Sequence, residues 1–201
     1  MTAEIVPLKD EVSALMRGIG ERARVSSSQM AEAKNEQKDM ALTQAALAIR
    51  EHVTGIIHAN EKDIVHAKQK GLDEAMIDRL RLDSKRIEAM AAGLETIVTI
   101  PDPVNKILDE WQRPNGLTLQ RVSIPLGVIG MIYESRPNVT ADAAGLAIKS
   151  GNAIVLRCGS EAMHSCTVIA ECMPPGLKAA GLPQDAVQLV PTPDRLAGAG
   201  M

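Results

Sequence analysis

The chain has 201 residues, 45% of them hydrophobic and 23% charged, so it can bury a sizeable core without disulfide bonds. A formal net charge of −3 without any Lys/Arg run disfavours nucleic-acid binding, and no apolar run reaches the roughly 20 residues of a membrane-spanning helix. With no Phe, one Tyr and one Trp, the core must be aliphatic, with Met filling its gaps.

The N-terminal part of the chain is predicted to be helical. Apolar residues recur at i, i+3, i+4 and i+7 over 12–19, which defines one face of a helix. The polar run 26–28 should end this helix, and a longer helix should cover 35–59. Asn60 then has the residue type of an N-cap for a short helix that stops before Gly71.

A further helix is expected to begin near Asp83 and to end before Pro101, because proline cannot continue a helix. Its inward face is predicted to consist of Ile87, Met90, Ala91, Leu94 and Ile97. The dipeptide Asn115-Gly116 signals a turn, and the residues after it, 117–124, have the composition of a strand.

From Pro125 onward the pattern becomes that of alternating strands and helices. The predicted elements are strands at 127–133, 153–156 and 187–190, and helices at 138–149 and 161–180, the second interrupted by Pro174-Pro175. Strand–helix–strand spacing of this kind predicts a parallel sheet, which argues against a purely helical interaction protein.

Two loops follow the first two strands of this predicted sheet, Glu134–Asn138 and Arg157–Glu161. Ligands of an open parallel sheet bind beyond the carboxyl ends of its strands. Each loop carries an arginine and leads into a helix N-terminus, which favours an anion. The sequence therefore predicts a phosphate-binding site here, with both loops facing one shared pocket.

The chain contains three cysteines close together: Cys158, Cys166 and Cys172. An odd number, without a recognisable signal peptide, predicts reduced thiols in a cytoplasmic protein, and we interpret them as buried thiols. No metal site is expected, because there is no CxxC motif. His58 and His66 lack the i, i+4 spacing of a metal-binding helix and are interpreted as solvated side chains.

The segment 124–162, IPLGVIGMIYESRPNVTADAAGLAIKSGNAIVLRCGSEA, resembles the signature region of glutamyl phosphate reductases (glutamate-5-semialdehyde dehydrogenases), within the aldehyde dehydrogenase superfamily. The stretches MIDRLRLDSKRIEAMAAGLETI, WQRPNGL and AGLPQDAVQLVPTPDR are also similar to that family. The resemblance implies an α/β, aldehyde-dehydrogenase-like fold. Residues 1–110 would form the N-terminal helical part of the cofactor domain, 111–126 a β-arm for oligomerisation, and 127–201 a partial Rossmann-like NADP-binding domain.

The implied reaction is the NADPH-dependent reduction of L-glutamyl 5-phosphate to L-glutamate 5-semialdehyde, with release of phosphate, in proline biosynthesis. A thiolate would displace the phosphate, and hydride would reduce the thioester. The resemblance further suggests a homo-oligomer in the full-length form and an association with glutamate 5-kinase, with no nucleic-acid or membrane partner.

The resemblance also implies roles for individual residues. Asn138 would stabilise the oxyanion, although its position also suits a helix N-cap. Arg157 would approach the adenosine ribose and neutralise a 2′-phosphate, although it and Arg136 are also read as ordinary surface arginines. The other residues implied to lie near the cofactor or the substrate phosphate are Ser135, Arg136, Gly159, Ser160 and Glu161.

The family's catalytic cysteine lies downstream of residue 201, and none of the three cysteines here falls in its motif. We therefore expect the chain to correspond to the N-terminal half only, to lack the catalytic domain and to be inactive alone. The alternative is a non-catalytic remnant that keeps a nucleotide-binding or dimerisation role.

Overall fold

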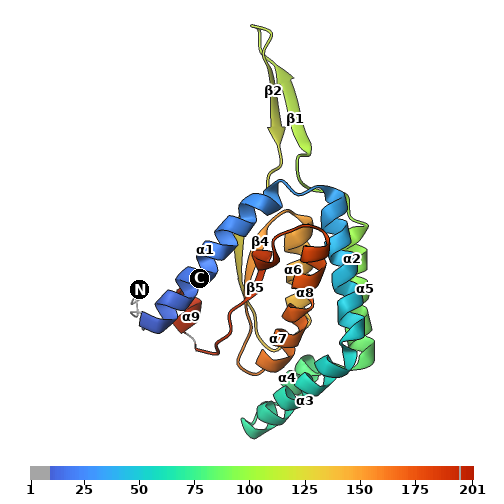
Figure 1. Ribbon diagram of the computed structural model, residues 1–201, viewed down its shortest axis with the longest axis vertical. Helices are drawn as coiled ribbons and strands as arrows, with labels where there is room; N and C mark the ends of the chain where they lie inside the picture. The colour runs from blue at the N-terminus through green and yellow to red at the C-terminus, as the bar shows by residue number, and fades with distance from the viewer. Residues whose placement is uncertain (1–9, 195) are drawn as a thin grey trace.

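The computed structural model describes residues 10–194 and 196–201, and Figure 1 shows their arrangement. The helices are α1 (Asp10–Ala31), α2 (Asn35–Glu51), α3 (Val53–Gln69), α4 (Glu74–Leu80), α5 (Ser84–Val98), α6 (Val139–Lys149), α7 (Met163–Glu171), α8 (Met173–Ala179) and α9 (Leu196–Ala199), with a 3₁₀ turn, η1 (Gln184–Ala186). The strands are β1 (Ile107–Gln112), β2 (Thr118–Val122), β3 (Val128–Ile132), β4 (Ala153–Arg157) and β5 (Val187–Leu189).

The centre of the molecule is a parallel sheet of order β3-β4-β5. Its three strands and their direction confirm the sequence prediction. Alternate residues of β4 point to opposite faces. Val155 packs with α1 on one face, whereas Ile154 and Leu156 belong to the larger core that α2 and α5–α8 cover on the other.

Helix α1 runs further than predicted, because the serines at 26–28 do not break it. The hydroxyls of Ser27 and Ser28 donate to the carbonyl of Arg24, 2.8 and 3.5 Å away. Serine satisfied within a helix in this way does not need to cap its end. The predicted apolar face is confirmed by the burial of Met16 and Ile19.

The predicted helix over 35–59 is divided at His52, which has φ −96° and ψ 12°, and α3 continues past residue 60. Asn60 is therefore not an N-cap but a buried residue inside α3, with 1% of its surface exposed. Its amide nitrogen donates to the carbonyl of Leu80 at 2.8 Å and to Ser165 Oγ at 3.0 Å. Its amide oxygen accepts from the N–H of Leu82 at 2.8 Å. The side chain of Asn60 therefore bonds to distant segments of the chain and does not cap a helix, contrary to the prediction from its local sequence.

Helix α5 confirms the prediction that started it at Asp83, whose carboxylate accepts from the N–H of Arg86 at 2.7 Å. All five residues predicted to face inward are buried.

The short helix α4 was not predicted. Asp73 caps it by accepting from the N–H of Met76 at 2.7 Å, which is the usual role of aspartate at this position.

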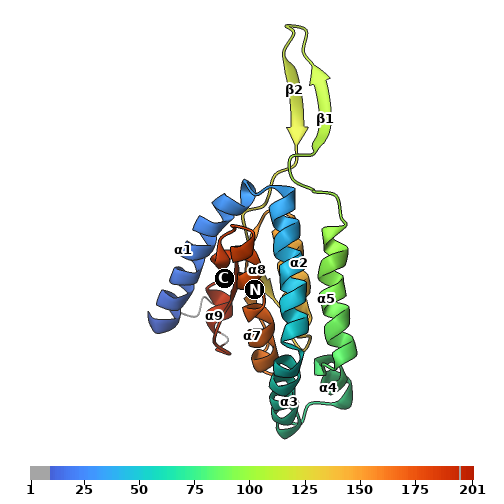
Figure 2. The same ribbon diagram turned by 45° about the vertical axis from the view of Figure 1, so that its right-hand side comes forward.

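Strands β1 and β2 form an antiparallel hairpin around the predicted Asn115-Gly116 turn, where Gly116 has φ +84°. The hairpin begins at Ile107, so the predicted boundary at residue 111 falls inside β1. Nearly every residue of the hairpin is exposed, so its first strand lacks the alternation of a half-buried strand. Figures 1 and 2 show the hairpin projecting from one end of the molecule, with α3 and α4 at the other end.

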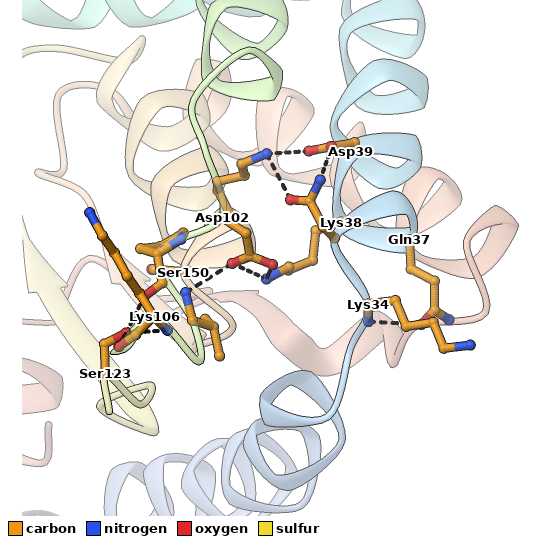
Figure 3. Close-up of polar contacts among 12 residues, drawn as sticks. Lys34, Gln37, Lys38, Asp39, Asp102, Lys106, Ser123 and Ser150 are labelled. Carbon is orange, nitrogen blue, oxygen red and sulfur yellow. Dashed lines mark hydrogen bonds and ion pairs between the residues drawn. The ribbon is translucent and has the colours of Figure 1, made fainter. Parts of the chain in front are cut away.

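An ion pair between the buried Lys38 and the partly exposed Asp102 fixes the segment that leads into the hairpin (Figure 3). Lys38 Nζ lies 2.7 Å from both carboxylate oxygens of Asp102, and 1% of the Lys38 side chain is exposed. Burial alone would raise the pKa of Asp102. The hydrogen bonds from Lys38 and from the N–H of Val104, with the charges of Lys38 and Lys149, outweigh burial and hold this pKa below its usual value.

Candidate functional site

The loops that follow β3 and β4 lie side by side, as the parallel pairing of Ile132 with Arg157 requires. The N–H and the hydroxyl of Ser135 donate to Glu161 Oε1, at 2.7 and 3.1 Å. Ser135 has φ +53°, a backbone conformation that residues other than glycine rarely adopt. The Glu161 carboxylate therefore connects the two loops and compensates for the unfavourable backbone at Ser135.

Gly159 has a structural reason to be glycine. A Cβ at this position would overlap the carboxylate of Glu161, which folds back over the loop. The glycine thus permits the contact between Glu161 and Ser135.

Arg157 is 8% exposed and lies beneath the C-terminal segment. Its Nη2 donates to the carbonyl of Asp194 at 3.2 Å, and its guanidinium lies close to Gly198. Its Nε is buried and has no hydrogen-bond partner among residues 10–194 and 196–201. A buried donor without a partner is costly, and an oxygen of a bound ligand would satisfy it.

A cavity of about 750 Å³ opens beside Ser160; we call it the lysine cavity. Val65, Met163 and Pro193 contribute apolar surface to it. Its cationic and imidazole side chains are His58, Lys62, His66, Lys70 and His164, and the carboxylate of Glu61 also lines it, so the two lysines leave one positive charge in excess. Lys70 Nζ lies 3.4 Å from Ser160 Oγ.

Sequence reasoning missed the contribution of α3 to the lysine cavity. His58 and His66 were interpreted as solvated side chains, and the lysines between and after them were not considered. The missed signal was the spacing of 58, 62, 66 and 70, which recur every fourth residue and therefore share one helix face.

A second cavity of about 440 Å³ lies on the other side of the loop after β3; we call it the arginine cavity. Its charged side chains are Arg79, Arg81, Arg86, Arg136, Asp78 and Asp142, and Asn138 also lines it.

Asn138 occupies the N-cap position of α6, but its side chain makes no capping hydrogen bond. Its amide nitrogen instead donates to Asp142 Oδ2 at 2.9 Å. Burial raises the pKa of Asp142, and the hydrogen bond from Asn138 opposes that shift. The alternative reading of Asn138 as a capping side chain is thus wrong, and its amide is available at the edge of the arginine cavity.

The expectation of one shared pocket needs correction. Asn138 and Arg136 line the arginine cavity, Ser160 lines the lysine cavity, and Arg157 lines neither. The two loops are adjacent, but the hydrogen bonds between Ser135 and Glu161 close the space between them. The neighbouring side chains therefore face two separate cavities.

The three cysteines are buried and free, as predicted. Burial, with a smaller contribution from the charge of Glu171, raises the pKa of the Cys172 thiol to about 11.

In the part of the chain that the structure describes, no three His, Cys, Asp or Glu side chains gather as metal ligands would. Within the same part, every helix is too short or too polar to cross a membrane.

A parallel sheet with two polar loops at its carboxyl edge, flanked by helices and extended by a hairpin, defines a Rossmann-like α/β protein. The aldehyde dehydrogenase family model matches residues 8–201, and the chain belongs to that family. This confirms the fold predicted from the sequence.

The chain is similar to γ-glutamyl phosphate reductases in sequence and in structure. The enzyme of Paramagnetospirillum magneticum is 54% identical over 187 residues, which cover 93% of this chain and 44% of that protein. The crystal structure of the Thermotoga maritima enzyme has a TM-score of 0.87 and 37% identity, covering 90% of this chain and 44% of that one. The crystal structure of the Saccharomyces cerevisiae enzyme has a TM-score of 0.84 and 31% identity, covering 88% of this chain and 46% of that one. The chain spans less than half the length of these relatives.

Proposed function

We propose that the chain is the cofactor-binding half of a reductase that converts L-glutamyl 5-phosphate and NADPH to L-glutamate 5-semialdehyde, phosphate and NADP, in the cytoplasmic synthesis of proline. The observation that carries the proposal is the pair of linked loops at the carboxyl edge of the sheet, with a cationic cavity on each side. Sequence identity of 51–54% to proteins named γ-glutamyl phosphate reductase supports the substrate.

The residues around the lysine cavity fit NADPH, which would supply the hydride. Ser160 and Lys70 can bind its 2′-phosphate. Val65, Met163 and Pro193 offer an apolar surface on which an adenine ring can lie.

On the other side of the loops, Asn138 can donate to the oxyanion that develops on the substrate carbonyl. Asp142 holds the amide through its hydrogen bond and so orients the second N–H. One such neutral donor contributes about 3 kcal/mol to transition-state stabilisation in well-studied enzymes.

The thiol that this reaction needs is not accessible in this chain, because Cys158, Cys166 and Cys172 are all buried. A second half that carries the nucleophile must therefore complete the site. A chain without such a partner would keep only nucleotide binding or a dimer contact.

Calorimetric titration with NADPH and NADH tests the cofactor assignment. We expect NADPH to bind at least tenfold more tightly than NADH, and Lys70→Gln to reduce that preference, whereas Lys85→Gln, an exposed lysine of α5 outside the lysine cavity, should not. The chain alone should not oxidise glutamate semialdehyde in the presence of phosphate and NADP. Equal affinity for the two cofactors, or measurable turnover, would contradict the proposal.

A further inference from the structure

The arginine cavity contains an excess of positive charge that the fold itself does not neutralise. Four guanidinium groups line it against two carboxylates, Asp78 and Asp142, which leaves two positive charges in excess. A cavity lined by an excess of one charge attracts ligands of the opposite charge, here an anion.

Of the four arginines, Arg86 has a structural task among the residues that the structure describes. Arg86 forms an ion pair with Asp78 at 3.0 Å and donates to the carbonyls of Asp78 and Arg81, which holds the turn between α4 and α5. By contrast, no hydrogen bond or ion pair with any described residue engages the guanidinium groups of Arg79, Arg81 or Arg136. These three guanidinium groups can therefore donate hydrogen bonds to a ligand.

The position of the turn is fixed from the buried side of the molecule. Asn60 binds the carbonyl of Leu80 and the N–H of Leu82, the two residues that flank Arg81. Across the cavity, Arg136 follows Ser135, which Glu161 holds in place. The arginines therefore project from backbone that is anchored on both sides, which lowers the entropy cost of binding a ligand.

We propose that Arg79, Arg81 and Arg136 bind the phosphoryl group of the substrate, and that the arginine cavity is the subsite for a doubly charged acyl phosphate. This inference rests on the proposed function. Guanidinium forks match the geometry of phosphate oxygens, and two excess positive charges match a phosphate dianion. Asn138 lies in the same cavity, so the carbonyl joined to that phosphate is placed beside its amide.

Calorimetric titration of the chain with L-2-amino-5-phosphonopentanoate tests the subsite, because this stable compound carries a phosphonate and an amino-acid end. Arg79→Gln and Arg136→Gln are expected to weaken binding about tenfold each, and the double variant more. Arg121→Gln, on the exposed strand β2, serves as the matched control and should bind as the unaltered chain does. Circular dichroism and melting curves verify that each variant is folded; the three arginines are exposed, so folding should be retained.

Affinity for the phosphonate should also fall as NaCl is raised, because the site is open to solvent and charged. Unchanged affinity in the double variant, or no binding to the unaltered chain, overturns the subsite. The NADPH titration is independent of these arginines. Cofactor binding without arginine-dependent phosphonate binding would refute the subsite alone, and the reverse result would refute the cofactor assignment alone.

Discussion

At the scale of single residues, Asn60 shows how one buried amide organises both cavities. It fixes the turn that carries Arg81, and through Ser165 it reaches the first turn of α7, which follows the loop of Ser160. Asp63, one helical turn further along α3, accepts from the N–H groups of His164 and Ser165 at 3.1 and 2.8 Å. The side of α3 that faces the protein thus positions the elements that surround the candidate site.

Replacing Asn60 by Ala should destabilise the chain. The change leaves the carbonyl of Leu80 and the N–H of Leu82 buried without their partner, which costs about 3 kcal/mol. For a chain of this size the Tm should fall by roughly 6–12 °C. Thermal melts monitored by circular dichroism measure the shift, with Thr54→Ala, exposed on the same helix, as the control. A shift no larger than that of the control would show that the three hydrogen bonds do not stabilise the fold.

Residue identity alone predicted only part of the candidate site. The two loops were found because an arginine and a helix start follow each apolar strand, a pattern confined to a few consecutive residues. The partners of Asn60 lie 20 and 105 residues away, and local patterns cannot bring such segments together. The separation of the two cavities depends on the Ser135–Glu161 contact, which no periodicity in the sequence indicates.

At the scale of elements, α5 and the strands of the parallel sheet were predicted, whereas the exposed β1 and α4 were not. Helix α5 buries five residues on one face, so its period was visible in the sequence. Strand β1 buries none, and α4 has a single buried residue, Leu80, so neither left a periodic signal. Where packing does not select residue type, sequence patterns carry little information about structure.

The Lys38–Asp102 pair, which joins α2 to the segment before the hairpin, should make the stability of the chain sensitive to acid. The pKa of Asp102 is lowered in the folded chain from its ordinary value of 3.8, so its stabilising contribution is complete above about pH 4 and is lost as the pH falls through the folded pKa. Asp102→Asn should lower the Tm at pH 7, because Lys38 loses its partner at a cost of about 3 kcal/mol. The difference between variant and unaltered chain should then shrink at lower pH.

Melting curves between pH 7 and pH 3 measure this linkage. Asp109→Asn, on the exposed strand β1, is the matched control and should follow the unaltered chain throughout. A constant difference between Asp102→Asn and the unaltered chain across this range would mean that Asp102 does not titrate with folding.

At the scale of the whole molecule, the hairpin lies at one end and helices α3 and α4, whose residues line the two cavities, lie at the other (Figure 2), so contacts made by the hairpin need not obstruct the cavities. The exposed apolar residues of the hairpin are Ile107, Leu108, Trp111, Leu117 and Val122. Apolar side chains on an open two-stranded ribbon are typical of a surface that another chain covers. We expect this surface to mediate self-association.

Sedimentation velocity of the unaltered chain should therefore show a concentration-dependent dimer. Leu108→Glu together with Leu117→Glu should reduce the dimer fraction at least tenfold, because charges would be buried in an apolar contact. Thr118→Glu, exposed on the same hairpin, adds a charge without removing large apolar surface and serves as the control. A purely monomeric unaltered chain would refute the role of the hairpin.

Because aromatic residues are scarce, the intrinsic fluorescence of the chain reports on only two positions. Its sole tryptophan, Trp111, lies on the hairpin with 42% of its surface exposed, whereas its sole tyrosine, Tyr133, is buried beside the loops and bonded to Thr140. Indole emission will consequently change when another molecule excludes solvent from the hairpin. It will change little when the aliphatic core unfolds. Tryptophan emission during denaturation therefore reports on the hairpin and not on unfolding of the hydrophobic core.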